Sequence, residues 1–314
     1  MILLASRRCL VPFFPKERCL AGGVELDRAG CAIVIILLPL WDKVKAAIIQ
    51  VVEAKKALGQ NFLIDQSVVR ELVDIAGVRK DDTVLEVGAG TGVVTLELAK
   101  RGGKIITVEF DRDLIPTLEE NLKGFSNVEI INADILQLET GKLKPENFKI
   151  VGSIPYQITS PLIHKILHSK DRPKSITFII QKEVAEKIAA KPPHATYLSN
   201  FVDNFGETHV VKVIKPGAFS PQPKVDSAII HIELYQKPKI EDTFKLEKFL
   251  HHGFTQPRKM LHHRFDAEIL TGSKILPQAR PARLSKEDWR NLYRELSRTR
   301  ERSKTRRGDG TWRN

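Results

Sequence analysis

Cysteine is scarce in this chain, which leaves little for sulfur chemistry to build on. The 314 residues contain three cysteines, Cys9, Cys19 and Cys31, and all of them fall in the first tenth of the sequence. They form no CxxC pair and have no histidine at metal-ligand spacing, so neither a disulfide framework nor a zinc site is indicated. We expect no metal cofactor and a reducing, cytoplasmic setting.

Long apolar runs are also missing. The stretch 32–40 is strongly apolar, but it is much shorter than the roughly 20 residues that a transmembrane helix needs. It starts too late, and follows the acidic residues Glu25 and Asp27 too closely, to be typical of a signal peptide. We therefore expect no membrane association, and we treat residues 1–52 as an N-terminal extension of uncertain status.

Acidic residues are too few to balance the basic ones. Lysine and arginine number 50 against 38 aspartates and glutamates, a formal charge of +12. This surplus favours a polyanionic partner, although on charge alone it could equally be a surface that aids solubility. From Glu241 to the end, 18 basic residues stand against 10 acidic ones. If the partner is RNA, this last quarter of the chain is expected to contact phosphates.

From Lys55 onward, short β-branched runs alternate with helical stretches, a pattern typical of a mostly parallel sheet covered by helices. Asp65 can cap a first helix that ends at Gly77. The last two strands have no helix between them and should pair as an antiparallel hairpin at one edge. The prediction is an α/β fold with a seven-stranded, doubly wound, Rossmann-like sheet that has one antiparallel edge strand. The predicted strands are 83–87, 105–108, 128–131, 148–151, 176–180, 210–214 and 228–234.

A second, smaller unit follows the sheet. The segment 236–239, Gln-Lys-Pro-Lys, reads as a linker, and most of the residues after it have a helical pattern. We predict a first domain over residues 53–236 and a small α-helical domain over 240–297. The tail 298–314 is rich in arginine and poor in apolar residues, so we predict that it is basic and disordered.

A glycine-rich loop, Glu86-Val-Gly-Ala-Gly-Thr-Gly, joins the first predicted strand to the helix after it. Gly88 and Gly90 allow a ligand to approach the backbone closely, and the helix N-terminus offers free N–H groups to a carboxylate or phosphate. A dinucleotide-binding loop would have the spacing GxGxxG, but Val93 occupies the third glycine position. NAD binding is therefore disfavoured.

Carboxylates close the next two predicted strands. Glu109 ends the second strand, where it can accept hydrogen bonds from both hydroxyls of a ribose. Asp134 ends the third strand and is placed to accept from an adenine amino group. Because the carboxyl ends of parallel strands meet at one edge, these residues indicate a nucleoside site at the topological switch point. The ligand favoured by this set is S-adenosylmethionine; the alternative is that both residues are ordinary surface carboxylates.

The fourth predicted strand ends in Ser153-Ile-Pro-Tyr156, which resembles the NxPY motif of amino-group methyltransferases, with serine in place of asparagine. Together with ALGQNFL at 57–63 and FSPQPKVDS at 219–227, it resembles the ribosomal RNA adenine dimethyltransferase family of the KsgA/RsmA type. The resemblance runs from about Ala54 to Leu296. It implies a monomeric, S-adenosylmethionine-dependent enzyme whose partner is the immature small ribosomal subunit. The implied reaction is N6,N6-dimethylation of two adjacent adenosines near the 3′ end of small-subunit rRNA.

The resemblance also implies roles for single residues. The Ser153 side chain and the Ile154 carbonyl would hold the adenine amine in a nucleophilic geometry, in line with the sulfonium methyl group. Tyr156 and Phe219 would stack on the flipped base, although both could instead be core aromatics. The residues implied for the cofactor are Asn61, Leu63, Gly88, Gly90, Glu109, Asp134 and Ser153.

Two segments of the helical part, 254–261 and 280–285, are also similar to the C-terminal domain of that family. They supply four candidates for phosphate contact, each of which could equally be a solvated charge. These are Arg258, Lys259, Arg280 and Arg283.

Rival functions remain open at the level of sequence. The related large-subunit rRNA adenine methyltransferase shares the glycine loop and the aromatic pair, whereas the full helical domain and the PKVDSA sequence favour the small-subunit enzyme. A ribosome-assembly factor that binds immature subunits without methylating them is supported by the departure at Ser153. An NAD-linked dehydrogenase would also need a histidine or lysine constellation for hydride transfer, and none is evident.

Overall fold

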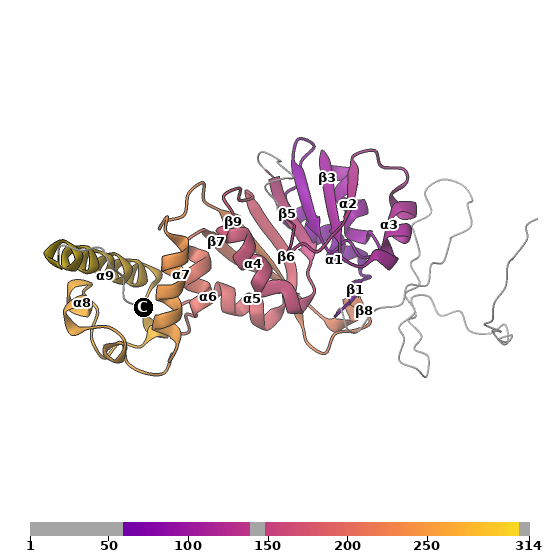
Figure 1. Ribbon diagram of the computed structural model, residues 1–314. Helices are drawn as coiled ribbons and strands as arrows, with labels where there is room; N and C mark the ends of the chain where they lie inside the picture. The colour runs from indigo at the N-terminus through magenta and orange to yellow at the C-terminus, as the bar shows by residue number, and fades with distance from the viewer. Residues whose placement is uncertain (1–58, 139–147, 308–314) are drawn as a thin grey trace, which may run out of the picture.

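A seven-stranded sheet forms the centre of the fold in the computed structural model, which describes residues 59–138 and 148–307 (Figure 1). The strand order is β4-β3-β2-β5-β6-β9-β7, and a separate small sheet pairs β1 with β8. The strands are β1 (Phe62–Leu63), β2 (Thr83–Val87), β3 (Lys104–Glu109), β4 (Val128–Asn132), β5 (Phe148–Ser153), β6 (Ser175–Gln181), β7 (Gly206–Ile214), β8 (Phe219–Ser220) and β9 (Ser227–Leu234).

Helices cover both faces of the sheet, and helices also make up the part of the chain from Thr243 onward, which was predicted to be the helical domain (Figure 1). The α-helices are α1 (Gln66–Ala76), α2 (Val93–Arg101), α3 (Ile115–Leu122), α4 (Thr159–His168), α5 (Lys182–Ala189), α6 (Tyr197–Asp203), α7 (Thr243–Phe254), α8 (Ala267–Gly272) and α9 (Lys286–Arg307). The 3₁₀ helices are η2 (Arg112–Leu114), η4 (Tyr156–Ile158), η5 (Pro216–Ala218), η6 (Leu261–His263) and η7 (Pro281–Arg283). None of the described helices combines the length and the apolar character needed to cross a membrane.

Alternate residues of the central strands point to opposite faces of the sheet, so two apolar layers form. Val84 and Ile105 pack in one cluster with α1 and α2. Their neighbours Leu85 and Ile106 pack in the other cluster, which includes residues of α4, α5 and α6. Strands buried on both faces in this way are near-continuous apolar runs, which is why they are easily found in the sequence.

The predicted seven-stranded, doubly wound sheet with one reversed strand is confirmed, but the prediction that this strand lies at the edge is wrong. β9 runs antiparallel to both β6 and β7, and it lies one position inside the edge that β7 forms. The chain leaves β6, passes through α5 and α6 and forms β7 two positions away in the sheet. A shorter connection then leads to β9, which lies between β6 and β7.

The first helix begins and ends where the sequence predicts. Asp65 caps α1 and accepts hydrogen bonds from the backbone N–H groups of Ser67 and Val68. The helix ends at Gly77, whose φ of 58° is left-handed, a conformation that glycine adopts without the strain of a side chain.

The predicted disorder of the tail is wrong for residues 298–307, because α9 continues to Arg307. Trp289 and Leu292 are buried and anchor the first half of the helix. The second half is composed mainly of arginine, lysine and glutamate, which favour helix, so a helix that is already nucleated by packing can continue through them. The predicted extension 1–52 and residues 308–314 lie outside the described residues.

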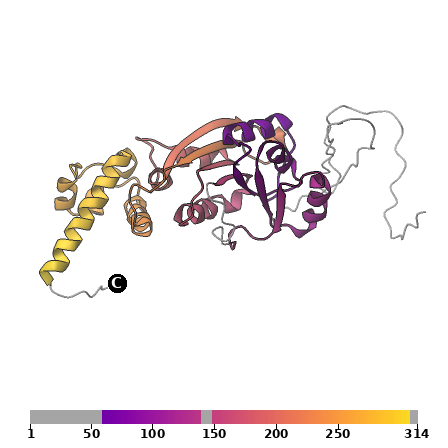
Figure 2. The ribbon, with the colours of Figure 1, turned by 90° about the horizontal axis from the view of Figure 1, so that it is seen from above.

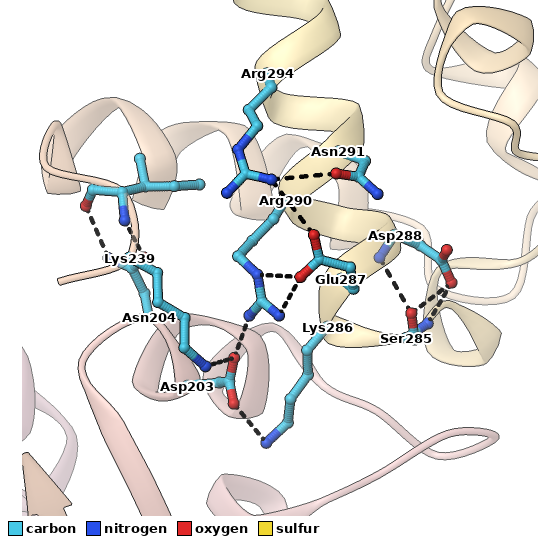
Figure 3. A network of polar contacts seen from close by, with 11 residues as sticks. Asp203, Asn204, Lys239, Ser285, Lys286, Glu287, Asp288, Arg290, Asn291 and Arg294 are labelled. Carbon is cyan, nitrogen blue, oxygen red and sulfur yellow. Dashed lines mark hydrogen bonds and ion pairs between the residues drawn. The ribbon is translucent and has the colours of Figure 1, made fainter. Parts of the chain in front are cut away.

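An ion-pair cluster around the buried Asp203 of α6 joins the sheet part of the chain to the start of α9 (Figure 3). Its carboxylate lies 3.2 Å from Lys239 Nζ, 3.1 Å from Lys286 Nζ and 2.5 Å from Arg290 Nη1. Burial by itself would raise the pKa of Asp203, but the three cations outweigh it and the pKa is lowered. Because Lys286 and Arg290 belong to α9, the cluster holds the start of that helix against the sheet domain. In Figure 2, α9 lies at the end of the molecule opposite α1, α2 and α3.

Candidate functional site

A cavity of about 250 Å³ lies at the carboxyl ends of β2, β3, β4 and β5. The segment 59–63 and Phe219 close it from the other side. All the residues predicted for cofactor binding and catalysis line this cavity: Asn61, Leu63, Gly88, Gly90, Glu109, Asp134, Ser153, Ile154, Tyr156 and Phe219. The tertiary structure thus brings together residues that are spread over more than half of the described chain.

The glycine loop passes along the cavity in a conformation that side chains rarely adopt. Gly88, Gly90 and Gly92 have φ values of 76°, 58° and 86°. A Cβ atom on Gly92 would lie 2.8 Å from a methyl carbon of Leu118, and one on Gly90 would lie 3.3 Å from the Phe62 ring. Both the backbone angles and the tight space require glycine here. The loop leads directly into α2, so it can present backbone N–H groups to a ligand.

Glu109 ties the glycine loop to the end of β3. Its Oε2 accepts a hydrogen bond of 2.8 Å from the Gly90 N–H, and its Oε1 accepts one of 2.8 Å from the Asp111 N–H. Burial raises the pKa of Glu109, although these backbone hydrogen bonds act in the opposite direction. Since a carboxylate can accept about four hydrogen bonds, Glu109 can still accept one from a ligand hydroxyl.

Glu86, the first residue of the glycine-loop motif, lies under the loop and outside the described lining of the cavity. It is completely buried. Its Oε2 accepts hydrogen bonds from Thr95 Oγ1 at 2.6 Å and Thr107 Oγ1 at 2.7 Å, and its Oε1 has no partner among the described residues. Burial, and to a smaller extent the charge of Glu109, raise the pKa of Glu86 to about 7.

Stability should therefore fall as the pH rises through the range in which Glu86 ionises. The folded protein holds this proton up to a pH of about 7, whereas an ordinary glutamate has a pKa of 4.5. The stabilising contribution of the protonated form is complete below the lower value and is lost between the two, a change on the order of 3 kcal/mol. Glu86→Gln cannot ionise, so its melting temperature should decline less than that of the wild type between pH 5 and pH 8.

Glu129→Gln is the control for this comparison, because Glu129 is an exposed glutamate of β4. Its profile should follow that of the wild type. Parallel profiles for the wild type and Glu86→Gln would contradict the raised pKa.

The segment Ser153–Tyr156 forms the end of the cavity that follows β5. Ser153 is the last residue of β5, and the N–H of Ile154 donates to the Ile179 carbonyl of β6 at 3.0 Å. Tyr156 begins η4 and is half-buried, and burial raises the pKa of its hydroxyl group. Phe219, the other predicted aromatic surface, is 3 % exposed. Tyr156 therefore presents the more open of the two rings.

A two-stranded sheet connects the two loops that close the cavity. In β1 and β8, Phe62 pairs with Ser220 and Leu63 pairs with Phe219. Leu63, predicted to cover a cofactor, thus pairs directly with Phe219, predicted to contact the base. Sequence analysis missed this pairing, because two-residue strands have no recognisable periodicity.

Several lining residues were not predicted from the sequence, among them Phe110 and Gln60. Phe110 is 59 % exposed and lines the cavity immediately after Glu109. Its position after a carboxylate at a strand end was the signal that could have found it. Gln60, to which the sequence assigned no role, donates from Nε2 to Asp111 Oδ2 at 2.8 Å, so it connects the segment 59–63 to the loop after β3.

The four basic candidates of the helical part lie in two neighbouring segments, and Arg283 ends the 3₁₀ helix η7 in the second of them. The Leu261 N–H donates to the Ala279 carbonyl at 2.9 Å, and the His262 N–H donates to the Pro277 carbonyl at 3.2 Å. These bonds bring the chain near 258–262 beside the chain near 277–283. The exposed side chains that result are Arg258, Lys259, Arg280 and Arg283, none of which lines the described cavity. In the described part of the chain, no cluster of histidine, cysteine, aspartate or glutamate is arranged to hold a metal ion.

Comparison with known proteins agrees with this architecture. Curated relatives called ribosomal RNA small subunit methyltransferase A include proteins of Dehalococcoides mccartyi, 37 % identical over 78 % of this chain and 89 % of the relative, and of Alkaliphilus oremlandii, 36 % identical over 77 % and 91 %. The crystal structure of the 23S rRNA methyltransferase ErmE is 30 % identical, covers 76 % of this chain and all of its own, and has a TM-score of 0.64. A dimethyladenosine transferase from Plasmodium falciparum shares the fold, with 24 % identity, coverage of 74 % and 96 %, and a TM-score of 0.63.

The family model for ribosomal RNA adenine dimethylase matches residues 51–298, which include the whole cavity and most of the helical domain. The chain therefore belongs to the ribosomal RNA adenine dimethylase family.

Proposed function

We propose that this chain uses S-adenosylmethionine to dimethylate the N6 atoms of two adjacent adenosines near the 3′ end of small-subunit rRNA. In this proposal it acts as a cytoplasmic monomer on the immature small ribosomal subunit. The strongest support is that the nucleoside acceptors Glu109 and Asp134 line the same cavity as the segment Ser153–Tyr156. A cofactor end and a base end thus share one space, as methyl transfer requires.

The residues at the cofactor end suit S-adenosylmethionine. Gly88 and Gly90 add no side chains to the loop wall, and the Glu109 carboxylate lines the same cavity. Asp134 is half-buried beside them, and its Oδ1 accepts from the Leu136 N–H at 2.8 Å, which orients the carboxylate. When bound, S-adenosylmethionine supplies an electrophilic methyl group on a positively charged sulfur atom. Asn61 and Leu63 would cover it.

At the base end, the protein has to hold an amine whose lone pair is delocalised into the adenine ring. Acceptors at Ser153 and at the Ile154 carbonyl would favour a more nucleophilic geometry of that amine. Stacking on Tyr156, with Phe219 as a second aromatic surface, would fix the plane of the flipped base. A serine side chain is shorter than asparagine, so we expect its contact with the amine to be longer or mediated by water.

The small-subunit substrate is supported by the relatives named for it, which match up to about nine tenths of their own length. The ErmE likeness keeps large-subunit rRNA as the second candidate. The hypothesis of a binding protein without catalytic activity is supported by the serine at position 153 alone. The other residues predicted for the base end, Ile154, Tyr156 and Phe219, all line the cavity.

The proposal is tested by methyl transfer to small subunits that lack this modification. The wild type is expected to transfer labelled methyl groups, and Ser153→Asn should be about threefold to tenfold faster, since one neutral hydrogen bond is worth about 0.5–1.5 kcal/mol. Ser160→Asn makes the same exchange at an exposed position outside the described cavity lining and should not change the rate. Label that appears only in large-subunit RNA would favour the second candidate, and no label with the wild type would leave a binding protein.

A further inference from the structure

We infer that Ser227 is a positioning residue that sets the ring plane of Tyr156 for methyl transfer. The hydroxyl groups of the two residues are 2.7 Å apart and form a hydrogen bond. Ser227 is completely buried, and it is not among the described residues that line the cavity. It can therefore influence a substrate only through Tyr156. This inference rests on the proposed function of the cavity.

Ser227 is a rigid point of attachment because of its place in the sheet. It is the first residue of β9 and pairs in register with Gln181 of β6 and Ile214 of β7. Asp226, the residue before it, is also held in place. Its backbone carbonyl accepts a hydrogen bond of 3.0 Å from the Lys182 N–H, and its carboxylate lies 2.8 Å from Lys215 Nζ. The Ser227 hydroxyl therefore projects from a strand that has neighbours on both sides.

Tyr156 is fixed at both ends as a result. Its backbone follows Pro155, whose ring restricts the chain at the start of η4. Its hydroxyl group, at the far end of the side chain, is held by Ser227. Between these points the ring has two rotatable bonds. The hydrogen bond at the tip restricts χ1 directly. It favours one ring plane through χ2 because a phenolic O–H group prefers to lie in the plane of the ring.

The orientation of the ring matters because a stacked base adopts its plane. A tilt of the base moves the N6 lone pair away from the line along which the methyl group travels, and misalignment of reacting atoms lowers the rate steeply. Affinity is less sensitive, since a tilted ring still offers an aromatic face. We therefore expect loss of the Ser227 hydroxyl to lower kcat and to leave the KM for RNA nearly unchanged. This also gives a role to the sequence Pro-Lys-Val-Asp-Ser at 223–227. That sequence carries part of the family resemblance, but none of its residues is among the described residues that line the cavity.

The experiment compares Ser227→Ala, Tyr156→Phe and the double variant in methyl transfer to undermethylated small subunits. Each single variant removes one end of the hydrogen bond and should lower kcat by about threefold to tenfold. The double variant should lose no more than either single one, because both act through the same bond. Affinity for S-adenosylmethionine, measured by calorimetry, should stay within about twofold of the wild type. Additive losses in the double variant would overturn the inference.

Thr177→Val is the matched control. The Thr177 hydroxyl of β6 is hydrogen-bonded to His231 Nδ1 of β9 at 2.9 Å, and neither residue is among the described lining residues. This variant removes a comparable buried hydroxyl from the same pair of strands, so it should lower the melting temperature without changing kcat. If Ser227→Ala behaves in the same way, the role of Ser227 is merely structural.

A second readout does not depend on catalysis. A synthetic RNA hairpin with 2-aminopurine in place of one target adenosine should lose fluorescence when that base stacks on Tyr156. We expect weaker quenching with Ser227→Ala and Tyr156→Phe than with the wild type or Thr177→Val. A wild type that transfers no methyl group but quenches would refute the proposed reaction and keep the positioning role. Equal quenching by the wild type and Ser227→Ala would refute the positioning role.

Discussion

Replacing Glu109 by alanine is expected to weaken the binding of S-adenosylmethionine by a factor of about one hundred or more. The carboxylate lines the cavity at the end of β3 and is held in place by the N–H groups of Gly90 and Asp111. If it accepts from both ribose hydroxyls, the variant loses two hydrogen bonds to a charged group, each worth about 1.5–3 kcal/mol. Isothermal titration calorimetry measures the change directly. Glu109→Gln keeps the shape but loses the charge and one acceptor, so it should fall between alanine and the wild type.

Two controls separate binding from folding. Melting temperatures show whether loss of the backbone hydrogen bonds has unfolded the loop, and Glu129→Gln removes a charge from β4 at an exposed position. Burial raises the pKa of Glu109, so the carboxylate becomes protonated at a higher pH than an ordinary glutamate does. As the pH is lowered, the affinity of the wild type for S-adenosylmethionine should therefore begin to fall earlier. Affinity of a folded Glu109→Ala within twofold of the wild type would rule out this position for the ribose.

Removing the four exposed cations of the helical domain should flatten the salt dependence of RNA binding. Each phosphate neutralised in single-stranded or duplex nucleic acid contributes about 0.7–0.9 to the slope of log affinity against log salt, so four contacts amount to a change of about 3. Affinity at low salt should fall by about two orders of magnitude or more as a consequence. The quantity to measure is the dissociation constant for undermethylated small subunits at several salt concentrations. The variant replaces Arg258, Lys259, Arg280 and Arg283 by alanine.

The chain offers a control with the same loss of charge. Four exposed lysines belong to segments at the amino-terminal edge of the sheet, opposite the cavity, and their replacement by alanine should leave the slope nearly unchanged. They are Lys80, Lys100, Lys104 and Lys123. Equal slopes for the two quadruple variants would show that the helical domain acts through net charge alone. If the variant of Arg258, Lys259, Arg280 and Arg283 keeps the slope of the wild type, these four residues are not part of the RNA interface.

The amino-acid sequence was sufficient to predict the strands of the sheet and ten of the residues that line the candidate site. Buried strands such as β2 and β3 are apolar runs bounded by glycine and helix caps, which are local signals. Glu109 and Asp134 could be assigned to one site because parallel strands end at a common edge, so that residues far apart in the chain share a position by topology alone. The same reasoning placed Ser153 and Tyr156 beside them.

Features that depend on contacts between distant segments had no such signal. The pairing of Leu63 with Phe219, the bond between Tyr156 and Ser227 and the cations around Asp203 join residues that no local pattern relates. The helical state of residues 298–307 was also decided by tertiary structure, since packing at the start of α9 nucleates a helix that its composition alone does not reveal. The sequence by itself thus determined which residues end each strand and therefore which of them meet at the cavity. The tertiary structure decided how those residues are oriented, because orientation comes from contacts that form only when distant parts of the chain meet.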